Sequence, residues 1–572
     1  MCGKHVCLLA ISHMNIELLF THNLMNIQNV IRTTVAALAV MSTLGLQAEQ
    51  KTMKITQRYL NIPVSQRVDR HNLRYALRGD TLTVSVRIAD GEPDYWVFKD
   101  MTAYQGKKVT LMWDGPEGAL ERIVPADSIY GEGQMYREGN RPQFHFSTRR
   151  GWINDPNGLI YHNGLYHIYY QHNPYEREWG NMTWGHATSP DLLHWQEHDD
   201  VLHPDGLGTM FSGSAVYDSL NTSGFGTEKN PPLVYAYTAD NAQGEVQCIA
   251  YSLDGGMTLQ KYGGNPVIGL STTWNPRYTR DPRLFRYGGR DGHWVMVLNE
   301  GNGHSIYTSA NLREWTYRSH VPGLFECPEL FPLAVDGNPD NILWVMYGAS
   351  GTYMLGRFDG FTYTPVSGKH RYVTGTIYAA QTFTDAPGGR RIQLGWSRIG
   401  HFDMPFHGIM LLPTELSLRT TAAGPRLVSQ PVAEVRSLLH PLYSHPGNDR
   451  RQKVNEEIDR VQTGDCFHLS ATMHLAYSTS AGIDLDGQRI VDYDCNQNTI
   501  NGQFYAAQDP TSLDIALDIY VDRTTVEVFV DGGLYSYSME RHPRDGKRGL
   551  HFWGDDTRVS GVQIDQVESV WR

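Results

Sequence analysis

The chain has 572 residues, which is enough for several domains with buried cores. Its net charge is −12 and it contains no block of basic residues, so nucleic acid is not an expected partner. Aromatic residues make up 11% of the chain, with 56 Gly and 28 Pro, which favours a turn-rich β protein over a helical bundle.

The N-terminal segment has the pattern of a targeting signal. Residues 33–46 are apolar but too short to span a bilayer, and Arg32 supplies a positive charge before them. We predict a secretory signal peptide cleaved after Ala48, with residues 1–24 as an extension from an upstream start codon. No cysteine directly follows the apolar stretch, so we expect no lipid anchor, and because the stretch is short we expect no membrane span. The mature protein is expected to be exported, to the periplasm or beyond the cell.

Four cysteines remain after this cleavage: Cys248, Cys327, Cys466 and Cys495. Such a sparse and widely spaced set predicts neither a disulfide scaffold nor a zinc site. The sequence contains no HExxH motif and no complete EF-hand loop. We therefore expect no metal and no cofactor.

Residues 49–139 are predicted to form a small β-sandwich-like module. Residues 80–87 (DTLTVSVR) alternate with period two, as a half-buried strand does. Residues 95–98 and 108–113 are further predicted strands. The role of this module stays open between carbohydrate binding and packing against the rest of the chain.

Residues 140–417 contain one pattern five times: a turn or polar dipeptide, a short strand, a loop and an aromatic-rich strand. The copies begin near Asn157, Ser212, Asp281, Cys327 and Tyr378. Repeats built of strands alone predict the blades of a β-propeller, here with five blades. The inner strands of a propeller line one axial funnel, so residues far apart in the sequence can converge there.

Residues 418–572 are predicted to form a C-terminal β-sandwich. Residues 513–521 and 525–530 alternate strictly between apolar and polar side chains. The predicted fold is therefore all-β: a five-bladed β-propeller with a C-terminal β-sandwich and a small N-terminal β module.

The densest chemistry of the chain lies in residues 151–158, GWINDPNG. Pro156 keeps Asp155 out of the α region and in an extended conformation. Asn154 is a turn former, and the Trp152 ring lies nearby in the sequence. A carboxylate held among amides and beside an aromatic ring suits a sugar site, although a lone Asp-Pro is more often a surface turn.

Two other acids stand at the beginnings of repeats, Asp281 in RDP and Glu326 in ECP. Hydrolysis of a glycosidic bond needs two carboxyl groups, one of them ionised and one carrying a proton for the leaving oxygen. Three carboxyl groups in one funnel repel one another and are desolvated, which raises the pKa of one of them. Together with Asp155, these acids predict a glycosidase site.

These runs resemble the motifs of glycoside hydrolase family 32, the β-fructofuranosidases, and the likeness extends from Arg141 to the C-terminus. The resemblance implies that Asp155 is the nucleophile, Glu326 the acid/base and Asp281 the stabiliser of the sugar and of the transition-state charge. It also implies seven substrate-binding residues: Asn154, Gln171, Trp179, Phe211, Ser212, Arg280 and Trp396.

Two positions near these motifs raise separate questions. Cys327 matches the cysteine that follows the acid/base in the family, where it either tunes Glu326 or is an inert buried thiol. Thr376 stands where the family usually has an acid, and this departure concerns the subsite beyond the fructose, not the chemistry.

The resemblance implies a retaining hydrolase that releases fructose from β-fructans of the levan or inulin type, with sucrose as a further candidate substrate. The reaction would pass through a covalent fructosyl-enzyme and act from the chain end. It would place the carboxyl groups of Asp155 and Glu326 about 5–5.5 Å apart. Two alternatives stay open: a fructosyltransferase with the same acids, and a non-catalytic fructan-binding protein. The intact set of three acids argues against the binding protein.

Overall fold

A computed structural model describes residues 49–77, 80–475, 478–507, 511–542 and 549–571. The predicted signal peptide and its upstream extension lie outside the described residues. The described chain is almost entirely β, as predicted, with one α-helix, Arg451–Ile458, and short 3-10 helices. None of its described helices is long and apolar enough to cross a membrane.

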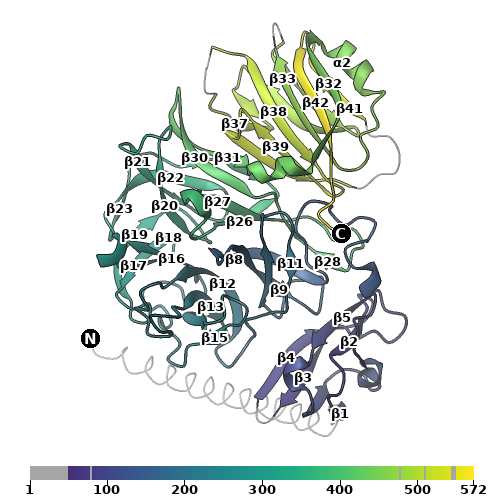
Figure 1. Cartoon of the computed structure of the whole chain (residues 1–572), viewed down its shortest axis with the longest axis vertical. Helices are drawn as coiled ribbons and strands as arrows, with labels where there is room; N and C mark the ends of the chain where they lie inside the picture. The colour runs from purple at the N-terminus through teal and green to yellow at the C-terminus, as the bar shows by residue number, and fades with distance from the viewer. Residues whose placement is uncertain (1–48, 78–79, 476–477, 508–510, 543–548, 572) are drawn as a thin grey trace, which may run out of the picture.

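The N-terminal module consists of two antiparallel sheets that enclose one core (Figure 1). Their strand orders are β1-β6-β3-β4 and β5-β2-β7. The strands are β1 Glu49–Lys54, β2 Tyr59–Val64, β3 His71–Leu77, β4 Asp80–Val86, β5 Tyr95–Asp100, β6 Lys108–Trp113 and β7 Val124–Ala126. Leu73, Val97 and Leu111 are fully buried between the two sheets, as period-two alternation predicts.

Five sheets follow and surround a common axis as the blades of a propeller (Figure 1). Blade one contains β8 Gly151–His162, β9 Leu165–Asn173, β10 Thr183–Ser189 and β11 Gln196–Glu197. Blade two contains β12 Thr209–Tyr217, β13 Leu233–Asp240, β14 Glu245–Ser252 and β15 Gln260–Lys261. Blade three contains β16 Thr279–Tyr287, β17 His293–Glu300, β18 Gly303–Ser309 and β19 Thr316–Pro322.

Blade four contains β20 Glu329–Ala334, β21 Ile342–Tyr347, β22 Thr352–Phe358, β23 Tyr363–Pro365 and the short β24 His370–Arg371. Blade five contains β26 Ile377–Thr382, β27 Ile392–Ser397, β29 Ile409–Met410, β30 Thr414–Thr421 and β31 Gly424–Pro431. The short strand β28, Phe406–His407, pairs in parallel with β8 of blade one. The five predicted repeats therefore correspond to five blades.

Blade five ends later than the boundary predicted at residue 417. Strand β30 pairs with β27, and β31 pairs with β30, so the sheet of the blade continues to Pro431. Strand β25, Val373–Gly375, precedes this blade in the chain but pairs in parallel with β40 of the C-terminal sandwich. Pairing between distant strands decides both features, and local alternation does not encode it.

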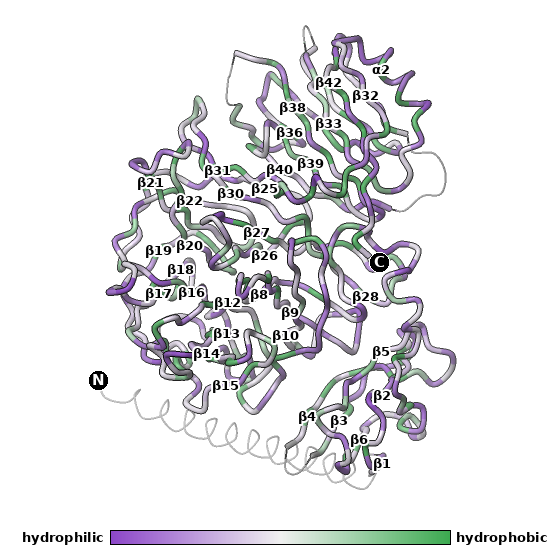
Figure 2. The backbone as a smooth tube through the Cα atoms, viewed as in Figure 1, coloured by the Kyte–Doolittle hydropathy of each residue, from purple (hydrophilic) through white to green (hydrophobic). Residues whose placement is uncertain are grey.

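The C-terminal sandwich packs a seven-stranded sheet, β25-β40-β39-β38-β33-β42-β32, against a five-stranded sheet, β37-β36-β35-β34-β41. Its strands are β32 Leu439–Arg450, β33 Phe467–His474, β34 Ser480–Leu485, β35 Gln488–Asp494, β36 Thr499–Ile500, β37 Gln503–Phe504, β38 Asp514–Val521, β39 Thr525–Val530, β40 Tyr535–Glu540, β41 Leu550–Trp553 and β42 Arg558–Val567. The two alternating segments predicted here are confirmed as β38 and β39. Apolar and polar residues alternate along the strands of this sandwich in Figure 2.

Candidate active site

The inner strands of four blades are irregular where they approach the propeller axis. Their pairing with the second strand shifts register between Ile153 and Pro156, between Met210 and Gly213, between Arg280 and Arg283, and between Tyr378 and Gln381. A bulge of this kind bends the strand and turns a side chain away from the regular pleat. The segments between these positions contain Asp155, Ser212 and Asp281.

Several residues at the axis adopt backbone conformations that side chains other than glycine rarely adopt. The φ angles of Asp281, Glu326 and Cys327 are +64°, +51° and +41°. Each such residue costs about 1–3 kcal/mol and persists only where the surrounding structure enforces it. Strain at two of the three predicted acids is typical of a functional site.

Asp155, on β8, is held by a hydrogen bond on each carboxylate oxygen. The Ser212 hydroxyl donates to Oδ2 at 2.6 Å, and the Asn154 amide donates to Oδ1 at 3.0 Å. The Trp152 indole N–H in turn donates to the Asn154 side-chain oxygen at 2.8 Å, which fixes the orientation of that amide. The two hydrogen bonds limit the rotation of this carboxyl group. Asn154 and Ser212 therefore contact the predicted nucleophile directly.

Asp281, on β16, lies deepest of the three acids and is 7% exposed. The backbone N–H of Cys327 donates to its Oδ2 at 3.0 Å. The Cys327 sulfur lies 3.6 Å from Oδ2 of Asp281 and 3.6 Å from Oδ2 of Asp155. The thiol thus bridges these two acids, whereas the sequence left open that it tunes Glu326.

Glu326 lies just before β20, and its side chain is 19% exposed. The Tyr378 hydroxyl donates to its Oε2 at 2.5 Å, and the Arg280 guanidinium lies 3.5 Å from its Oε1. The backbone N–H of Glu326 donates to the side-chain oxygen of Asn299 at 2.8 Å. Glu326 is thus more accessible than Asp281, with a neutral hydrogen-bond donor on one oxygen and a cation near the other.

Desolvation is the largest cause that raises the pKa of Asp281, to about 8, and the charges of Asp155 and Glu326 act in the same direction. The positive charge of Arg280 opposes the shift. The acid cluster therefore keeps a proton near neutral pH. The prediction that one pKa is raised is confirmed, and the shift falls on Asp281.

The acid cluster also brings possible metal ligands together. One ligand atom each of Asp155, Asp281 and Cys327 lies within 4.8 Å of the others. Burial raises the pKa of the Cys327 thiol well above its usual value of 9.0, and a thiol that keeps its proton is a poor ligand. We assign no metal to these residues.

Further residues predicted to bind substrate surround the acids. Trp179 is 54% exposed, and its ring contacts the Phe211 ring at 5.9 Å between centroids. Trp396 is buried and packs edge-to-face against Trp152 at 5.7 Å. Gln171 is 2% exposed, and its amide nitrogen has no hydrogen-bond partner among the described residues. A buried donor of this kind can be satisfied by a sugar hydroxyl.

Arg280 is oriented by a residue that sequence reasoning missed. Glu245, on β14, forms an ion pair with the Arg280 guanidinium at 2.8 Å. Burial raises the pKa of Glu245 to about 7, while the charge of Arg280 opposes the shift. The Arg280 guanidinium also lies 5.8 Å from the Phe211 ring centroid. No local motif marks Glu245, because its partner lies 35 residues later in the chain.

Tyr378 was also missed as a site residue, although the sequence held a signal for it. It lies two residues after Thr376, in the run that departs from the family pattern. The Thr376 hydroxyl does not reach the acids: it hydrogen-bonds Ser397 at 2.7 Å and Ser538 at 3.1 Å. Thr376 thus contacts the C-terminal sandwich, and Tyr378 is the residue of this run that reaches an acid.

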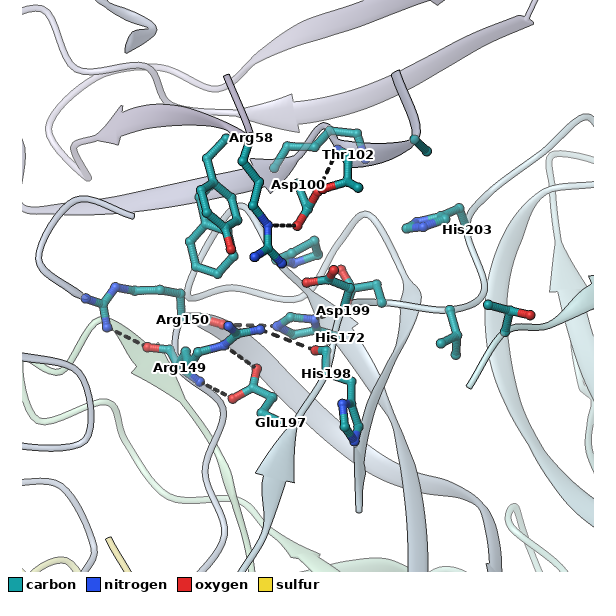
Figure 3. Close-up of a pocket in the computed structure, with 18 of the residues that line it drawn as sticks. Arg58, Asp100, Thr102, Arg149, Arg150, His172, Glu197, His198, Asp199 and His203 are labelled. Atoms are coloured by element: carbon teal, nitrogen blue, oxygen red, sulfur yellow. Dashed lines mark hydrogen bonds and ion pairs between the residues drawn. The ribbon is translucent and has the colours of Figure 1, made fainter. Parts of the chain in front are cut away.

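A separate cavity lies away from these acids. It has a volume of about 760 Å³ and is enclosed by the N-terminal module, blade one and part of blade two. Figure 3 shows its charged lining, including Arg58, Asp100, Arg149, Glu197 and Asp199. None of the predicted site residues lines it. Size alone therefore does not identify the active site of this protein.

The chain is similar to known proteins over both of its C-terminal units. The model of the glycosyl hydrolases family 32 N-terminal domain matches residues 145–431, and that of the family 32 C-terminal domain matches residues 452–569. The N-terminal β module precedes the matched region. The end of the first match coincides with the end of blade five.

Individual relatives agree with this assignment. A levanase of Bacillus subtilis is 35% identical over 507 residues, which cover 78% of this chain and 72% of the levanase. An extracellular exo-inulinase of Aspergillus niger is 32% identical over 521 residues, which cover 76% of this chain and 96% of that protein.

Solved structures match the same part of the chain. The exo-inulinase of Aspergillus awamori superposes with a TM-score of 0.67 at 29% identity, covering 76% of this chain and all of that one. A fructofuranosidase of Schwanniomyces occidentalis, solved with fructosylnystose, gives a TM-score of 0.64 at 26% identity, with 75% and 98% covered.

Proposed function

The chain belongs to glycosyl hydrolases family 32, and from the geometry of its acid cluster we propose that Asp155 is the nucleophile, Glu326 the acid/base and Asp281 the group that anchors the sugar. The protein is a glycoside hydrolase of the levanase and exo-inulinase type, which releases fructose from levan or inulin with retention of configuration. The observation that carries the residue assignment is the convergence of three carboxyl groups at the inner ends of three blades, two of them on strained backbone.

In the first step Asp155 attacks C2 of a terminal β-linked fructosyl unit. Its two hydrogen-bond donors, Ser212 and Asn154, limit its rotation and hold it in place for the attack. Glu326 protonates the departing glycosidic oxygen as the C2–O bond breaks. The product of this step is a covalent fructosyl-enzyme and a shortened chain.

In the second step Glu326 takes a proton from water, which attacks C2 and releases Asp155. Tyr378 and Arg280 hold the Glu326 side chain in position through both steps. Asp281 lies beside the nucleophile and binds fructose hydroxyls. With a raised pKa it can donate a hydrogen bond as well as accept one.

We place the terminal fructose among the side chains that surround the acids. Trp179 and Phe211 supply aromatic surface, and the unpartnered Gln171 amide supplies a buried donor. A compact site of this kind suits one sugar unit and supports action from the chain end. The partner is accordingly a fructan chain, and the choice between levan, inulin and sucrose depends on the subsites beyond this unit.

Release of reducing sugar from levan, inulin and sucrose tests the activity, with the Asp155→Ala variant as the blank. A fructosyltransferase would instead lengthen fructo-oligosaccharides and leave little free fructose. A binding protein would retain the polymer without releasing sugar. Proton NMR of the first product decides the stereochemistry: initial β-fructose supports double displacement, whereas initial α-fructose, or carboxyl groups about 6.5–9.5 Å apart, would indicate inversion.

Export is supported by the extracellular exo-inulinases among the relatives. We propose the periplasm as the destination of the mature protein, with Glu49 as its first residue. N-terminal sequencing of the exported protein tests this, and residues preceding Glu49 on that protein would contradict it.

We further propose that the chain divides into an N-terminal module at residues 49–139, a propeller at 140–431 and a sandwich from 432 onward. The last boundary replaces the predicted one at 417, because β30 and β31 complete blade five.

A further inference from the structure

The loop between β9 and β10, residues 174–182, carries the aromatic ring at the mouth of the proposed fructose site. Trp179 is 54% exposed and has the Phe211 ring beside it. The role of Trp179 in sugar binding rests on the proposed function. The contacts that hold its loop do not depend on that function.

The loop borders a hollow at each end. Pro174 and Tyr175 line the cavity of about 760 Å³ beside the module. Trp179 and Asn181 line a second hollow, of about 380 Å³, with residues of blade two. A loop that borders a hollow at each end depends on a limited set of contacts to keep its position.

The first support is apolar. Tyr175 is 4% exposed and belongs to the hydrophobic core of the N-terminal module, together with Tyr75 and Trp113. A side chain from the propeller, that of Tyr175, therefore completes the core of the N-terminal module. Burial of a large aromatic side chain contributes about 1.5–3 kcal/mol, which ties the start of the loop to the module.

The second support is ionic. Glu176 is fully buried and pairs with Arg70 at 2.7 Å and with Arg87, whose backbone N–H also donates to it at 2.7 Å. Glu178 pairs with the same two arginines, at 2.7 Å and 3.3 Å. Two arginines of the module thus neutralise two acids of the loop. Glu178 directly precedes Trp179, and Glu176 lies three residues before it.

The third support imitates a β-ladder. The Ser85 backbone N–H donates to the Asn181 side-chain oxygen at 2.8 Å, and the Asn181 amide donates to the Ser85 carbonyl at 2.8 Å. Asn181 adopts a left-handed conformation with φ of +48°. The pair of bonds fixes the end of the loop against strand β4 of the module.

The propeller also holds this loop: the Tyr175 backbone N–H and the Asn181 amide donate to the Asn173 side-chain oxygen, and His407 hydrogen-bonds the Arg177 carbonyl. The Asn173 amide donates to the carbonyl of Glu178 at 2.7 Å, and the Arg177 guanidinium donates to the carbonyl of Met404 at 2.9 Å. Neither residue neutralises Glu176 or Glu178. Loss of the module arginines would leave a buried carboxylate uncompensated, which a loop relieves by moving it into water.

We infer that the N-terminal module is a positioning element of the fructose site: through Arg70 and Arg87 it holds the 174–182 loop so that Trp179 stays at the mouth. The module contributes no catalytic residue. It affects the affinity for the sugar through the ring of Trp179, which belongs to the propeller.

Hydrogen–deuterium exchange tests the positioning without any substrate. In the Arg70→Ala/Arg87→Ala variant we expect amides of residues 174–182 to exchange at least about tenfold faster, whereas those of β14 stay unchanged. The control is Lys51→Ala, which removes an ion pair with Glu121 inside the module and does not touch the loop. Unchanged exchange in the loop would overturn the inference.

Kinetics tests the consequence. For a fructo-oligosaccharide, the double variant should raise KM about tenfold and change kcat less than about threefold, because the acids stay in place. Should that variant fold poorly, Glu178→Gln, whose side chain is 49% exposed, should raise KM in the same direction by a smaller factor.

A double-mutant cycle separates positioning from general destabilisation. If the arginines act through Trp179, their effect on KM should largely vanish in a Trp179→Ala background. Fully additive effects on KM would overturn the inference. A wild-type protein without fructanase activity would instead refute the proposed function, and the exchange measurement would still decide the positioning.

Discussion

Two hollows of this protein are lined by charged side chains: the funnel on the propeller axis and the cavity of about 760 Å³ between the module and blade one (Figure 3). The funnel brings three acids together with one arginine, Arg280. The cavity is lined by three histidines and by equal numbers of Lys or Arg and of Asp or Glu residues: Arg58, Lys99, Arg149 and Arg150 with Asp100, Glu197, Asp199 and Asp200.

The difference lies in what each arrangement can do. In the cavity, several charges are already satisfied by neighbours, such as Arg58 by Asp100 at 2.9 Å. In the funnel, burial and then the like charges of Asp155 and Glu326 raise the pKa of Asp281 to about 8, and Asp281 lies on strained backbone. A site with unbalanced charge and strained backbone can transfer protons, whereas one with balanced, paired charges stabilises an interface.

The largest expected effect is the loss of the nucleophile. Asp155→Ala should lower kcat on every fructan by about 10⁴-fold or more, because no other side chain supplies the attacking oxygen. Reducing-sugar release, with circular dichroism to verify folding, measures it. Substantial residual turnover by a folded variant would reassign the nucleophile.

Loss of the acid/base should depend on the leaving group. Glu326→Ala should lower kcat on levan or inulin by about 10²–10⁴-fold. The loss should be smaller for a fructoside whose leaving group needs no protonation, and added azide should restore part of the second step. Equal losses for both substrates would remove Glu326 from the acid role.

Asp281→Asn should separate activity from stability. Activity should fall by about 10²–10³-fold, because a group that binds the developing charge is altered. Its pKa is raised from 3.8 to about 8 on folding. As pH rises from about 4 to 8, the unfolded chain releases this proton while the folded chain keeps it, so the wild type loses stability over that window.

The Asn variant escapes this loss, which is at most about 6 kcal/mol. Thermal melts should therefore show a Tm advantage of Asp281→Asn that is small near pH 4 and grows toward pH 8. An advantage that does not change with pH would show that Asp281 is not held in its protonated form.

Tyr378→Phe should have an intermediate effect. It removes the 2.5 Å hydrogen bond to Glu326 and should lower kcat about ten- to a hundredfold, with KM within about threefold. Because Tyr378 is proposed to act through Glu326, its effect should largely disappear in a Glu326→Ala background. Additive losses would indicate a separate role for the tyrosine.

The smallest effect is expected in the larger cavity. Desolvation raises the pKa of Asp199, followed by repulsion from Asp100. Asp199→Ala should nevertheless change kcat/KM less than about twofold, since Asp199 lines an interface and not the funnel. A large loss of activity would mean that the two hollows are functionally connected.

The amino-acid sequence by itself determined the elements and the identities of the acids. Alternation with period two specifies strands such as β38, whose first residues alternate between exposed and buried, because burial of one sheet face needs only local order. The fivefold recurrence of a turn, a short strand, a loop and an aromatic-rich strand predicted five blades. The motifs around Asp155, Asp281 and Glu326 are contiguous in the chain, so the order of residues alone is enough to recognise them.

Tertiary structure decided how those acids are held and where the boundaries fall. Tyr378 reaches Glu326 across 52 positions of the chain, and Glu245 orients Arg280 across 35. The continuation of blade five to Pro431 depends on pairing of the same long-range kind. The role inferred for the module depends on Arg87 meeting Glu176 across 89 positions. Such contacts arise when separately folded sheets pack, and no local periodicity records them.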